Sequence, residues 1–285
     1  MPIATRPGMI SLRATQFIFL FLLLVTGHLH AATDSLRAAA PSPNIGDTIV
    51  SDIAGAGSDA ALFFTAPARF GAREWEITGG ILGGTGLIML ADDPVRRGFS
   101  GAHNATKDRI ADIGNLNGTI LPAAVISGGL YLSGLIFDSP SLRLAGRHIV
   151  ESVTFAAAIT TTIKTLVGRQ RPFLNGGPYV FHGPSLKDDF NSLPSGHTTV
   201  AFALCSSLAA DINRPWATVG LYSIATITGL SRIYVDRHWA SDTFLGAAIG
   251  TICGYGVSHL HDGSNGATGL LIVPTTSGFA LSYTF

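Results

Sequence analysis

Six apolar runs separated by short polar segments constrain the fold of this chain more than any other feature. Each run is rich in Ala, Val, Ile, Leu and Gly and is long enough for roughly four helical turns. Helices that are apolar on most faces bury themselves against one another or in a bilayer. The sequence therefore predicts an all-α fold, a six-helix bundle built from the runs at roughly residues 77–91, 119–137, 148–168, 197–211, 216–231 and 241–259.

Charged residues make up only 13% of the chain, and many of them gather where these runs begin or end. Three polar clusters stand out: Lys164–Pro172 (K-T-L-V-G-R-Q-R-P), Pro194–His197 (P-S-G-H) and Ser231–Asp242 (S-R-I-Y-V-D-R-H-W-A-S-D). Helices joined in sequence by short loops run antiparallel. We therefore expect all three clusters to meet at one end of the bundle and to form one pocket.

The spacing within each cluster predicts its local structure. Lys164 and Arg171 are seven residues apart, two turns along one helix face, and Pro172 would end that helix. Ser195 is expected to cap the next helix, which leaves backbone N–H groups at its start to bind an anion. His238 and Asp242, at positions i and i+4, would share one face of the last helix.

Together these side chains suit the transfer of a phosphoryl group. Lysine and arginine match the charge and the oxygen geometry of phosphate. An imidazole becomes a nucleophile when a carboxylate fixes its tautomer, which is the arrangement expected for His238 and Asp242. A second imidazole, His197, has an ordinary pKa near the working pH and can protonate the departing oxygen. Taken singly, each residue also has a structural explanation, such as a helix cap or a lysine that reaches towards solvent.

The combined pattern K-x6-R-P, P-S-G-H and S-R-x5-H-x3-D resembles the type 2 phosphatidic acid phosphatase family. That family shares its site with bacterial class A acid phosphatases and vanadium haloperoxidases, and the resemblance covers roughly residues 75–260. It implies that His238 forms a phosphohistidine, that His197 is the acid and that Asp242 orients His238. It also implies that no metal ion or other cofactor is needed and that the phosphoryl oxygens are bound by Lys164, Arg171, Ser195, Gly196 and Arg232.

The residues around the motifs, over 194–204 and 238–246, look more like those of lipid phosphatases than those of soluble acid phosphatases. We therefore expect a lipid phosphate or diphosphate ester as the substrate, with specificity set by the Phe173–Leu193 loop and by Ala91–Gly118, predicted as one amphipathic helix beside the site. A formal net charge of zero gives no basic surplus for nucleic acid. The alternatives are a broad-specificity soluble periplasmic acid phosphatase, a vanadium haloperoxidase and an inactive phosphate-binding membrane protein.

The ends of the chain predict export and a small appendage. Arg6 and Arg13 precede the apolar stretch Phe17–Val25, which indicates a signal peptide over residues 1–31, with a retained anchor as the alternative. Residues 32–75 would form a surface arm with one short helix near 46–64, and residues 76–262 the phosphatase helical domain. Alternation around residues 276–278 predicts a β-hairpin within the tail, residues 263–285.

The lengths of the apolar runs leave the relation to the membrane open. Several runs have only roughly 15–17 residues, which is short for a bilayer and suits a buried bundle. We expect association with a membrane and an active site on the periplasmic, extracytoplasmic side, and a soluble periplasmic protein is the alternative. Cys205 and Cys253 both lie inside apolar runs, which favours buried free thiols over a disulfide.

Overall fold

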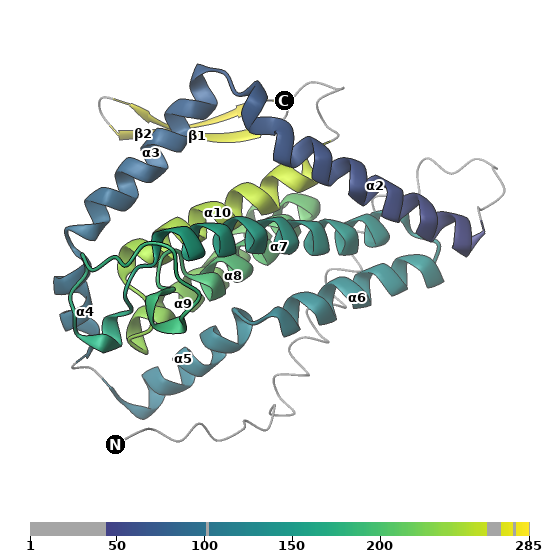
Figure 1. Ribbon diagram of the computed structural model, residues 1–285. Helices are drawn as coiled ribbons and strands as arrows, with labels where there is room; N and C mark the ends of the chain where they lie inside the picture. Colours follow the sequence, from purple (N-terminus) through teal and green to yellow (C-terminus); the bar gives the residue numbers. More distant parts are fainter. Residues whose placement is uncertain (1–43, 101–102, 261–268, 276–277, 285) are drawn as a thin grey trace.

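The computed structural model describes residues 44–100, 103–260, 269–275 and 278–284, and it confirms the predicted all-α fold (Figure 1). The helices within these ranges are α2 (Ile45–Thr65), α3 (Ala72–Met89), α4 (Asp92–Ser100), α5 (Ala105–Asn117), α6 (Ile120–Ile136), α7 (Pro140–Val167), α8 (Gly196–Ile212), α9 (Pro215–Tyr234) and α10 (Ala240–Ser258). Short 3₁₀ turns occur at Ala66–Arg69, Pro172–Leu174 and Asp188–Phe190. The six predicted runs correspond to α3, α6, α7, α8, α9 and α10.

Helix α8 lies at the centre of the bundle and contacts α7, α9 and α10 (Figure 1). Its Leu204 and Leu208 belong to a buried core that also includes Ile149 of α7, Leu221 of α9 and Ile249 of α10. Burial of these side chains is the main favourable term in the free energy of folding. Cys205 and Cys253 are buried free thiols, as predicted.

Three glycines spaced four residues apart allow α10 to pack closely on α8. A Cβ atom at Gly246 would lie 2.7 Å from the carbonyl oxygen of Ser195, and one at Gly254 would lie 2.6 Å from that of Ala203. Gly250, between them, faces the same helix. Small residues at this spacing let two helix backbones approach. The close approach fixes the start of α10 against the start of α8, where the second and third polar clusters lie.

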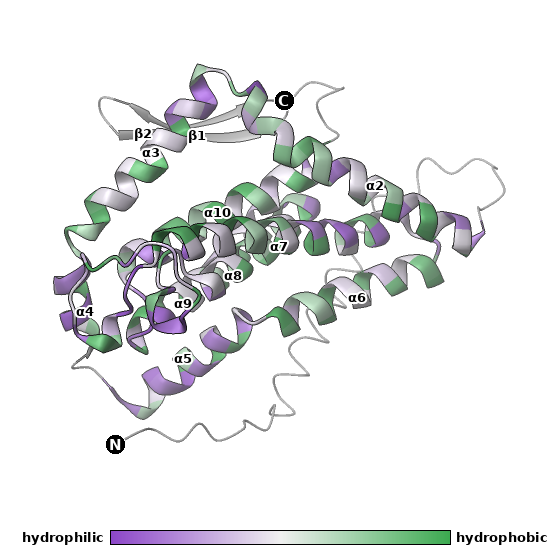
Figure 2. Cartoon of the chain, viewed as in Figure 1, coloured by the Kyte–Doolittle hydropathy of each residue, from purple (hydrophilic) through white to green (hydrophobic). Residues whose placement is uncertain are grey.

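The stretch Ala91–Gly118 is not the single amphipathic helix that the sequence predicted. It forms two helices, α4 and α5, because Asn104 starts a new helix and accepts a hydrogen bond from the backbone N–H of Lys107 at 2.9 Å. Figure 2 shows that α5 is largely hydrophilic whereas α6, which follows it, is apolar. The two helices meet at a bend of 55°.

The helix that the sequence predicted near residues 46–64 is present as α2, but the segment is more than a surface arm. Helix α2 has 21 residues and docks on the bundle through buried acids. Asp59 pairs with Arg147 of α7, while Asp52 pairs with Arg143 at 2.7 Å and accepts the hydroxyl of Tyr131 at 2.9 Å. The sequence failed to indicate this docking because acids on an isolated helix usually face solvent. The predicted signal peptide lies outside the described residues.

The C-terminal segment contains two antiparallel strands, β1 (Gly269–Thr275) and β2 (Gly278–Thr284). Their register pairs Gly269 with Thr284 and Thr275 with Gly278, which places the connection where the sequence predicts a turn. Among the described helices, α7 is long and apolar enough to cross a membrane, and α5 with α6 pass the same test as a bent pair. This finding concerns length and composition alone.

Candidate active site

The first polar cluster begins on α7 but does not stay on it. The helix ends at Val167 because Gly168 adopts a left-handed conformation, with φ of 61°, so Arg171 lies beyond the helix and not on the same face as Lys164. Pro172 is therefore not the residue that stops α7. The Arg171 side chain is largely buried and binds Asp188 of the following loop, at 2.6 Å through Nη2 and at 2.8 Å from Nε to the carbonyl oxygen.

The second cluster opens α8 as predicted, although its cap differs. Ser195 occupies the N-cap position, but its hydroxyl makes no capping bond and accepts a hydrogen bond from the hydroxyl of Thr198 at 2.9 Å. Its backbone N–H donates to the carbonyl oxygen of Asp242 at 2.9 Å, which ties the start of α8 to that of α10. Gly196 and His197 form the first turn of α8, where the helix dipole favours an anion.

The third cluster places His238 in a loop and not on a helix. Helix α10 begins at Ala240, so His238 and Asp242 do not share a helix face. The Nδ1 atom of His238 lies 2.8 Å from the carbonyl oxygen of Ser192 and 3.7 Å from Oδ2 of Asp242. A hydrogen bond from His238 to a backbone carbonyl therefore takes the place of the direct contact with the Asp242 carboxylate that the sequence predicted.

This contact decides the tautomer of His238. A carbonyl oxygen only accepts hydrogen bonds, so Nδ1 carries the proton and the neutral ring keeps its lone pair on Nε2. Burial, with the nearby Lys164 and Arg171, lowers the pKa of His238 to about 3 despite the opposing effect of Asp242. At neutral pH this side chain is a neutral imidazole with a nucleophilic Nε2.

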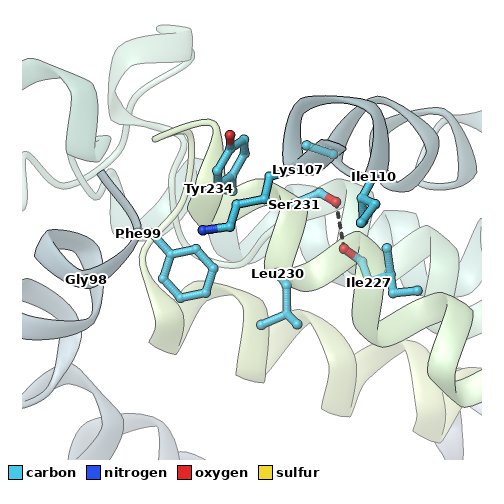
Figure 3. Close-up of a pocket in the computed structure, with 9 residues that line it drawn as sticks. Gly98, Phe99, Lys107, Ile110, Ile227, Leu230, Ser231 and Tyr234 are labelled. Carbon is cyan, nitrogen blue, oxygen red and sulfur yellow. Dashed lines mark hydrogen bonds between the residues drawn. The ribbon is translucent and has the colours of Figure 1, made fainter. Parts of the chain in front are cut away.

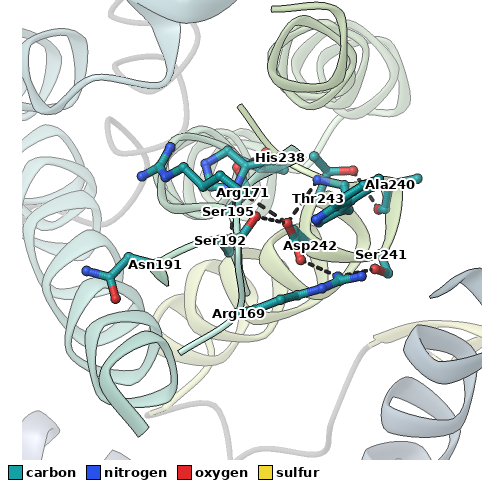
Figure 4. Close-up of polar contacts among 12 residues, drawn as sticks. Arg169, Arg171, Asn191, Ser192, Ser195, His238, Ala240, Ser241, Asp242 and Thr243 are labelled. Atoms are coloured by element: carbon teal, nitrogen blue, oxygen red, sulfur yellow. Dashed lines mark hydrogen bonds and ion pairs between the residues drawn. The ribbon is translucent and has the colours of Figure 1, made fainter. Parts of the chain in front are cut away.

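The Asp242 carboxylate is fully buried and organises the start of α10 (Figure 4). Its Oδ1 accepts from Arg169 at 2.6 Å, and its Oδ2 accepts from the hydroxyl of Ser192 at 2.5 Å and from the backbone N–H of Trp239 at 2.9 Å. Burial alone would raise the pKa of Asp242, but His238 and Arg169 outweigh it, and the pKa lies at about 2. Asp242 is thus a charged anchor for the segment that carries His238.

Arg169 and Ser192 were missed by the sequence argument. Arg169 lies within the first cluster and is wholly buried between Asp242 and Asp92 of α4. A second arginine two residues before Arg171 was a usable signal. A guanidinium that is buried in a helical bundle needs a carboxylate partner, so Arg169 could have been expected to pair with an acid near the site. Ser192 gave no such signal, since neither its carbonyl contact with His238 nor its hydroxyl contact with Asp242 follows from the spacing of the motifs.

Two cations of the site have only neutral partners. Lys164 donates to the carbonyl oxygen of Asn191 at 2.5 Å, and Arg232 donates from Nη1 to the side-chain oxygen of Asn115 at 2.7 Å. Within the described ranges no carboxylate forms an ion pair with either side chain, and Nε of the buried Arg232 has no hydrogen-bond partner. Burial and the neighbouring cation Arg171 lower the pKa of Arg232 to about 10 and that of Lys164 to about 8. A bound anion would raise the pKa of both side chains.

His197 belongs to the same cluster of charges. Burial, followed by Arg232, Arg171 and Lys164, lowers its pKa to about 4, which differs from the expected value near the working pH. Lys164 and Arg171 also lower the pKa of His238, so both imidazoles lie within electrostatic reach of the same cations. In the part of the chain that the structure covers, no three His, Cys, Asp or Glu side chains are grouped as metal ligands.

An open apolar pocket of about 350 Å³ lies beside this site, between α4, α5 and α9 (Figure 3). Lys107 of α5 points among its lining side chains, which include Phe99, Ile110, Ile227, Leu230 and Tyr234. Two of these helices, α5 and α9, are also joined by the hydrogen bond between Asn115 and Arg232. The pocket is therefore formed by elements that also hold one of the site cations, and part of its lining, on α4 and α5, belongs to the Ala91–Gly118 stretch where the sequence predicted specificity.

The fold and these contacts define a class: a helical bundle with a cation-rich site and two imidazoles at one end. Residues 145–265, which include all three polar clusters, match the model of the PAP2 superfamily. This match is to the superfamily of the type 2 phosphatidic acid phosphatases, which confirms the resemblance seen in the motifs.

Curated relatives match part of this chain. The chain is 44% identical over 86 residues to a lipid A 1-phosphatase of Porphyromonas gingivalis, an alignment that covers 28% of this chain and 19% of the relative. It is 31% identical over 107 residues to a lipid A 1-phosphatase of Rhizobium etli, covering 37% and 45%. The alignments thus span less than half the length of these relatives.

Two solved structures are similar at low identity. A crystal structure of Aquifex aeolicus LpxE aligns with a TM-score of 0.45 and 21% identity, covering 58% of this chain and 93% of that one. A PAP2-type phosphatidylglycerolphosphate phosphatase from Bacillus subtilis aligns with a TM-score of 0.48 and 18% identity, covering 65% and 95%.

Proposed function

We propose that this protein is an extracytoplasmic phosphatase that hydrolyses lipid phosphate or diphosphate esters through a phosphohistidine at His238. The observation that carries the proposal is the neutral His238 tautomer, fixed by the Ser192 carbonyl, beside cations that have no carboxylate partner. A nucleophile and an unsatisfied positive field in one place suit attack on a phosphate. The roles of the individual residues are part of this proposal.

In the first step, Lys164, Arg171 and Arg232 bind the phosphoryl oxygens, supported by the hydroxyl of Ser195 and the backbone N–H of Gly196. Nε2 of His238 attacks phosphorus, an N–P bond forms, and the bond to the leaving oxygen breaks. His197 donates its proton to that oxygen. A phosphate dianion offsets the cations that lower the pKa of His197, so substrate binding raises this pKa towards the range in which the ring is protonated.

In the second step, water attacks the phosphohistidine and His197 takes the proton of that water. The N–P bond breaks, phosphate leaves, and His238 returns to its neutral form. Asp242 acts in this scheme through Arg169 and Ser192, which hold the loop, and through its negative charge 3.7 Å from Nδ1 of His238. That charge stabilises the imidazolium character that develops as the N–P bond forms.

Three features favour a lipid as the substrate. The pocket between α5 and α9 is mainly apolar and would accept a hydrocarbon chain next to Arg232. Large apolar side chains are exposed on the outer helices, including Leu82, Leu87, Ile136, Val219 and Leu230, which suits contact with a membrane. The curated relatives are named lipid A 1-phosphatases, so a glycolipid phosphate is the first substrate to test.

The location outside the cytoplasm is proposed from the signal-like N-terminus, residues 1–31, with Arg6 and Arg13 before the apolar stretch. Fusion of a periplasmic reporter and cell fractionation would test export and membrane association together. Recovery of the reporter in the cytoplasm would contradict the proposed site location, and recovery in the soluble periplasmic fraction would contradict membrane association.

The mechanism is tested by trapping the intermediate. Purified protein quenched during turnover of ³²P-labelled lipid phosphate should carry phosphate that is labile in acid and stable in base, as expected for a phosphoramidate. Acid-stable label, or no label with full turnover, would reject the histidine nucleophile. We expect EDTA to leave phosphate release unchanged, and loss of activity on chelation would require a metal in the mechanism.

The substrate class is tested with micellar phosphatidate, lipid A and a polyprenyl diphosphate beside a water-soluble ester such as p-nitrophenyl phosphate. We expect kcat/KM for at least one lipid to exceed that for the soluble ester by about tenfold or more, because the apolar pocket adds binding energy. Equal values would favour the soluble acid phosphatase. Vanadate-dependent halide oxidation without phosphate release would instead indicate a haloperoxidase.

A further inference from the structure

Helix α4 lies outside the PAP2 match over residues 145–265, yet two of its side chains hold the loop that presents His238. Asp92 and Arg96 are four residues apart, on one face of α4. Arg96 binds Asp236, two residues before His238, and Asp92 binds Ser241, three residues after it. One face of α4 therefore binds the chain on both sides of His238.

The first contact is a two-point ion pair. Arg96 donates from Nε to Oδ1 of Asp236 at 2.6 Å and from Nη2 to Oδ2 at 2.7 Å. The geometry is that of a bidentate guanidinium–carboxylate pair, which fixes orientation as well as distance. Both side chains are mostly sheltered from solvent, with exposures of 19% and 33%. The pair is therefore less screened than a fully exposed one.

The backbone of Asp236 has an unusual conformation. It has a φ of 57°, in the left-handed region, at the turn that reverses the chain after α9. An aspartate tolerates this conformation at a small cost. The guanidinium of Arg96 also lies over the Trp239 ring, 5.5 Å from its centroid, so one side chain contacts the loop on either side of His238.

In the second contact, Asp92 of α4 caps the N-terminus of α10. The fully buried Asp92 carboxylate accepts from the backbone N–H of Ser241 at 2.9 Å and from its hydroxyl at 2.6 Å. It also accepts a hydrogen bond from Nη2 of Arg169 at 2.7 Å, and Nη1 of the same arginine donates to Asp242. Asp92 thus does from α4 what an N-cap residue normally does from its own helix.

We propose that α4 is a positioning clip for the nucleophile, with Arg96 and Asp92 as positioning residues that hold Nε2 of His238 in line with the bound phosphate. The inference rests on the proposed role of His238. Attack needs the reacting atoms at near-contact distance and aligned, and a misplacement of about 1 Å can lower the rate about 100-fold. Releasing one end of the loop should therefore lower kcat while leaving phosphate binding, which uses other residues, nearly unchanged.

The kinetic test uses Arg96→Ala. We expect kcat to fall about 10- to 100-fold while KM changes less than about threefold, and Arg96→Lys to recover part of the loss. Arg97→Ala is the matched control, because its ion pair is with Asp93 of the same helix, and it should keep wild-type kcat. Equal kcat in Arg96→Ala and Arg97→Ala would overturn the proposal, as would a loss confined to KM.

A double-mutant cycle separates the clip from a general loss of structure. Asp236→Asn keeps a residue that tolerates a positive φ but weakens the pair. If the two side chains act together, Arg96→Ala with Asp236→Asn should be no slower than Arg96→Ala alone. Multiplication of the two separate losses would show that Arg96 does not act through Asp236 and would contradict the clip.

A measurement independent of turnover distinguishes this inference from the proposed function. Hydrogen exchange of the purified full chain should be faster in Arg96→Ala for peptides that cover residues 235–241, and unchanged for peptides of α8. Asp92→Asn should have the same effect at residues 240–243. Wild-type protein without phosphatase activity would reject the proposed function, whereas unchanged exchange in both variants would reject the clip.

Discussion

The two ends of the bundle both bury charged residues, but they differ in what those charges are paired with. At the end where α2 docks on α7, Arg143 and Arg147 have carboxylate partners from the protein itself, Asp52, Asp59 and Glu151. At the end with the three polar clusters, Lys164 and Arg232 bind only neutral oxygens. In the first arrangement carboxylates of the protein itself balance the charge of the arginines, whereas the second has positive charge left to bind an anion.

Histidine shows the same contrast. Burial would lower the pKa of His148, but Asp211, at 2.9 Å from its Nδ1, raises it overall. His197 is buried among cations, and its pKa falls to about 4. Burial lowers the pKa of both rings, and the neighbouring charges either reverse this effect, as Asp211 does at His148, or add to it, as the cations do at His197. A perturbed group whose neighbours carry the same charge marks a functional site better than burial alone.

The largest expected effect separates the two ends by activity. His238→Gln should lower phosphate release by about 10⁴-fold or more, because the proposed nucleophile is lost, and His148→Gln should keep near wild-type turnover. Steady-state assays on the preferred lipid would measure both. Comparable losses in the two variants would erase the distinction between a catalytic and a structural cluster.

The second effect separates the ends by stability. Arg147→Met removes the guanidinium that faces Asp59 and Glu151 and should reduce the free energy of unfolding by about 3–5 kcal/mol. Turnover per folded molecule should stay unchanged. Chemical denaturation monitored by circular dichroism would measure the loss. A fully stable variant would mean that α2 does not depend on these ion pairs.

The pH dependence of stability should come largely from the His238 end. In the unfolded chain His238 takes up a proton below about pH 6.5, whereas its folded pKa is about 3. The unfolded state therefore binds more protons between these values, and stability falls as the pH drops from 7 to 4, by on the order of 3 kcal/mol from this residue. Thermal unfolding of wild type and His238→Gln across this range would test it, and parallel curves would contradict the burial of a neutral ring.

A smaller effect tests the geometry of the anion site. Arg171→Lys keeps the charge but loses the guanidinium fork, so the inhibition constant for inorganic phosphate should rise about tenfold. Arg143→Lys, at the opposite end, should leave that constant unchanged. Product-inhibition kinetics would compare the two, and an unchanged constant in Arg171→Lys would argue against a bidentate contact.

The smallest effect concerns the competition for Arg171. Asp188 holds this guanidinium, but its side chain is 71% exposed, which weakens the pair. Asp188→Asn should strengthen phosphate inhibition by about two- to threefold, because it frees positive charge for the ligand. Weaker inhibition would show that Asp188 orients Arg171 for binding and does not compete with phosphate.

Sequence reasoning was reliable where one local pattern decides the outcome. The six apolar runs form helices, and the two cysteines inside apolar runs are buried free thiols. It was wrong where a single residue changes the local path of the chain. Gly168 ends α7 before Arg171, and α10 starts after His238, so two predicted pairs on a shared helix face do not exist. The roles assigned to the site residues stay predictions until the variants are measured.

The sequence by itself determined the all-α class, the clustering of scarce charges at the ends of apolar runs, and the residue types that suit phosphate chemistry. Only the tertiary structure decided that a Ser192 carbonyl fixes His238, that Arg169 holds Asp242, and that α4 contacts the loop that carries His238. The reason is physical. These contacts join residues 46, 73 and 140 positions apart and depend on the directions of carbonyl groups and side chains, which spacing along the chain does not specify.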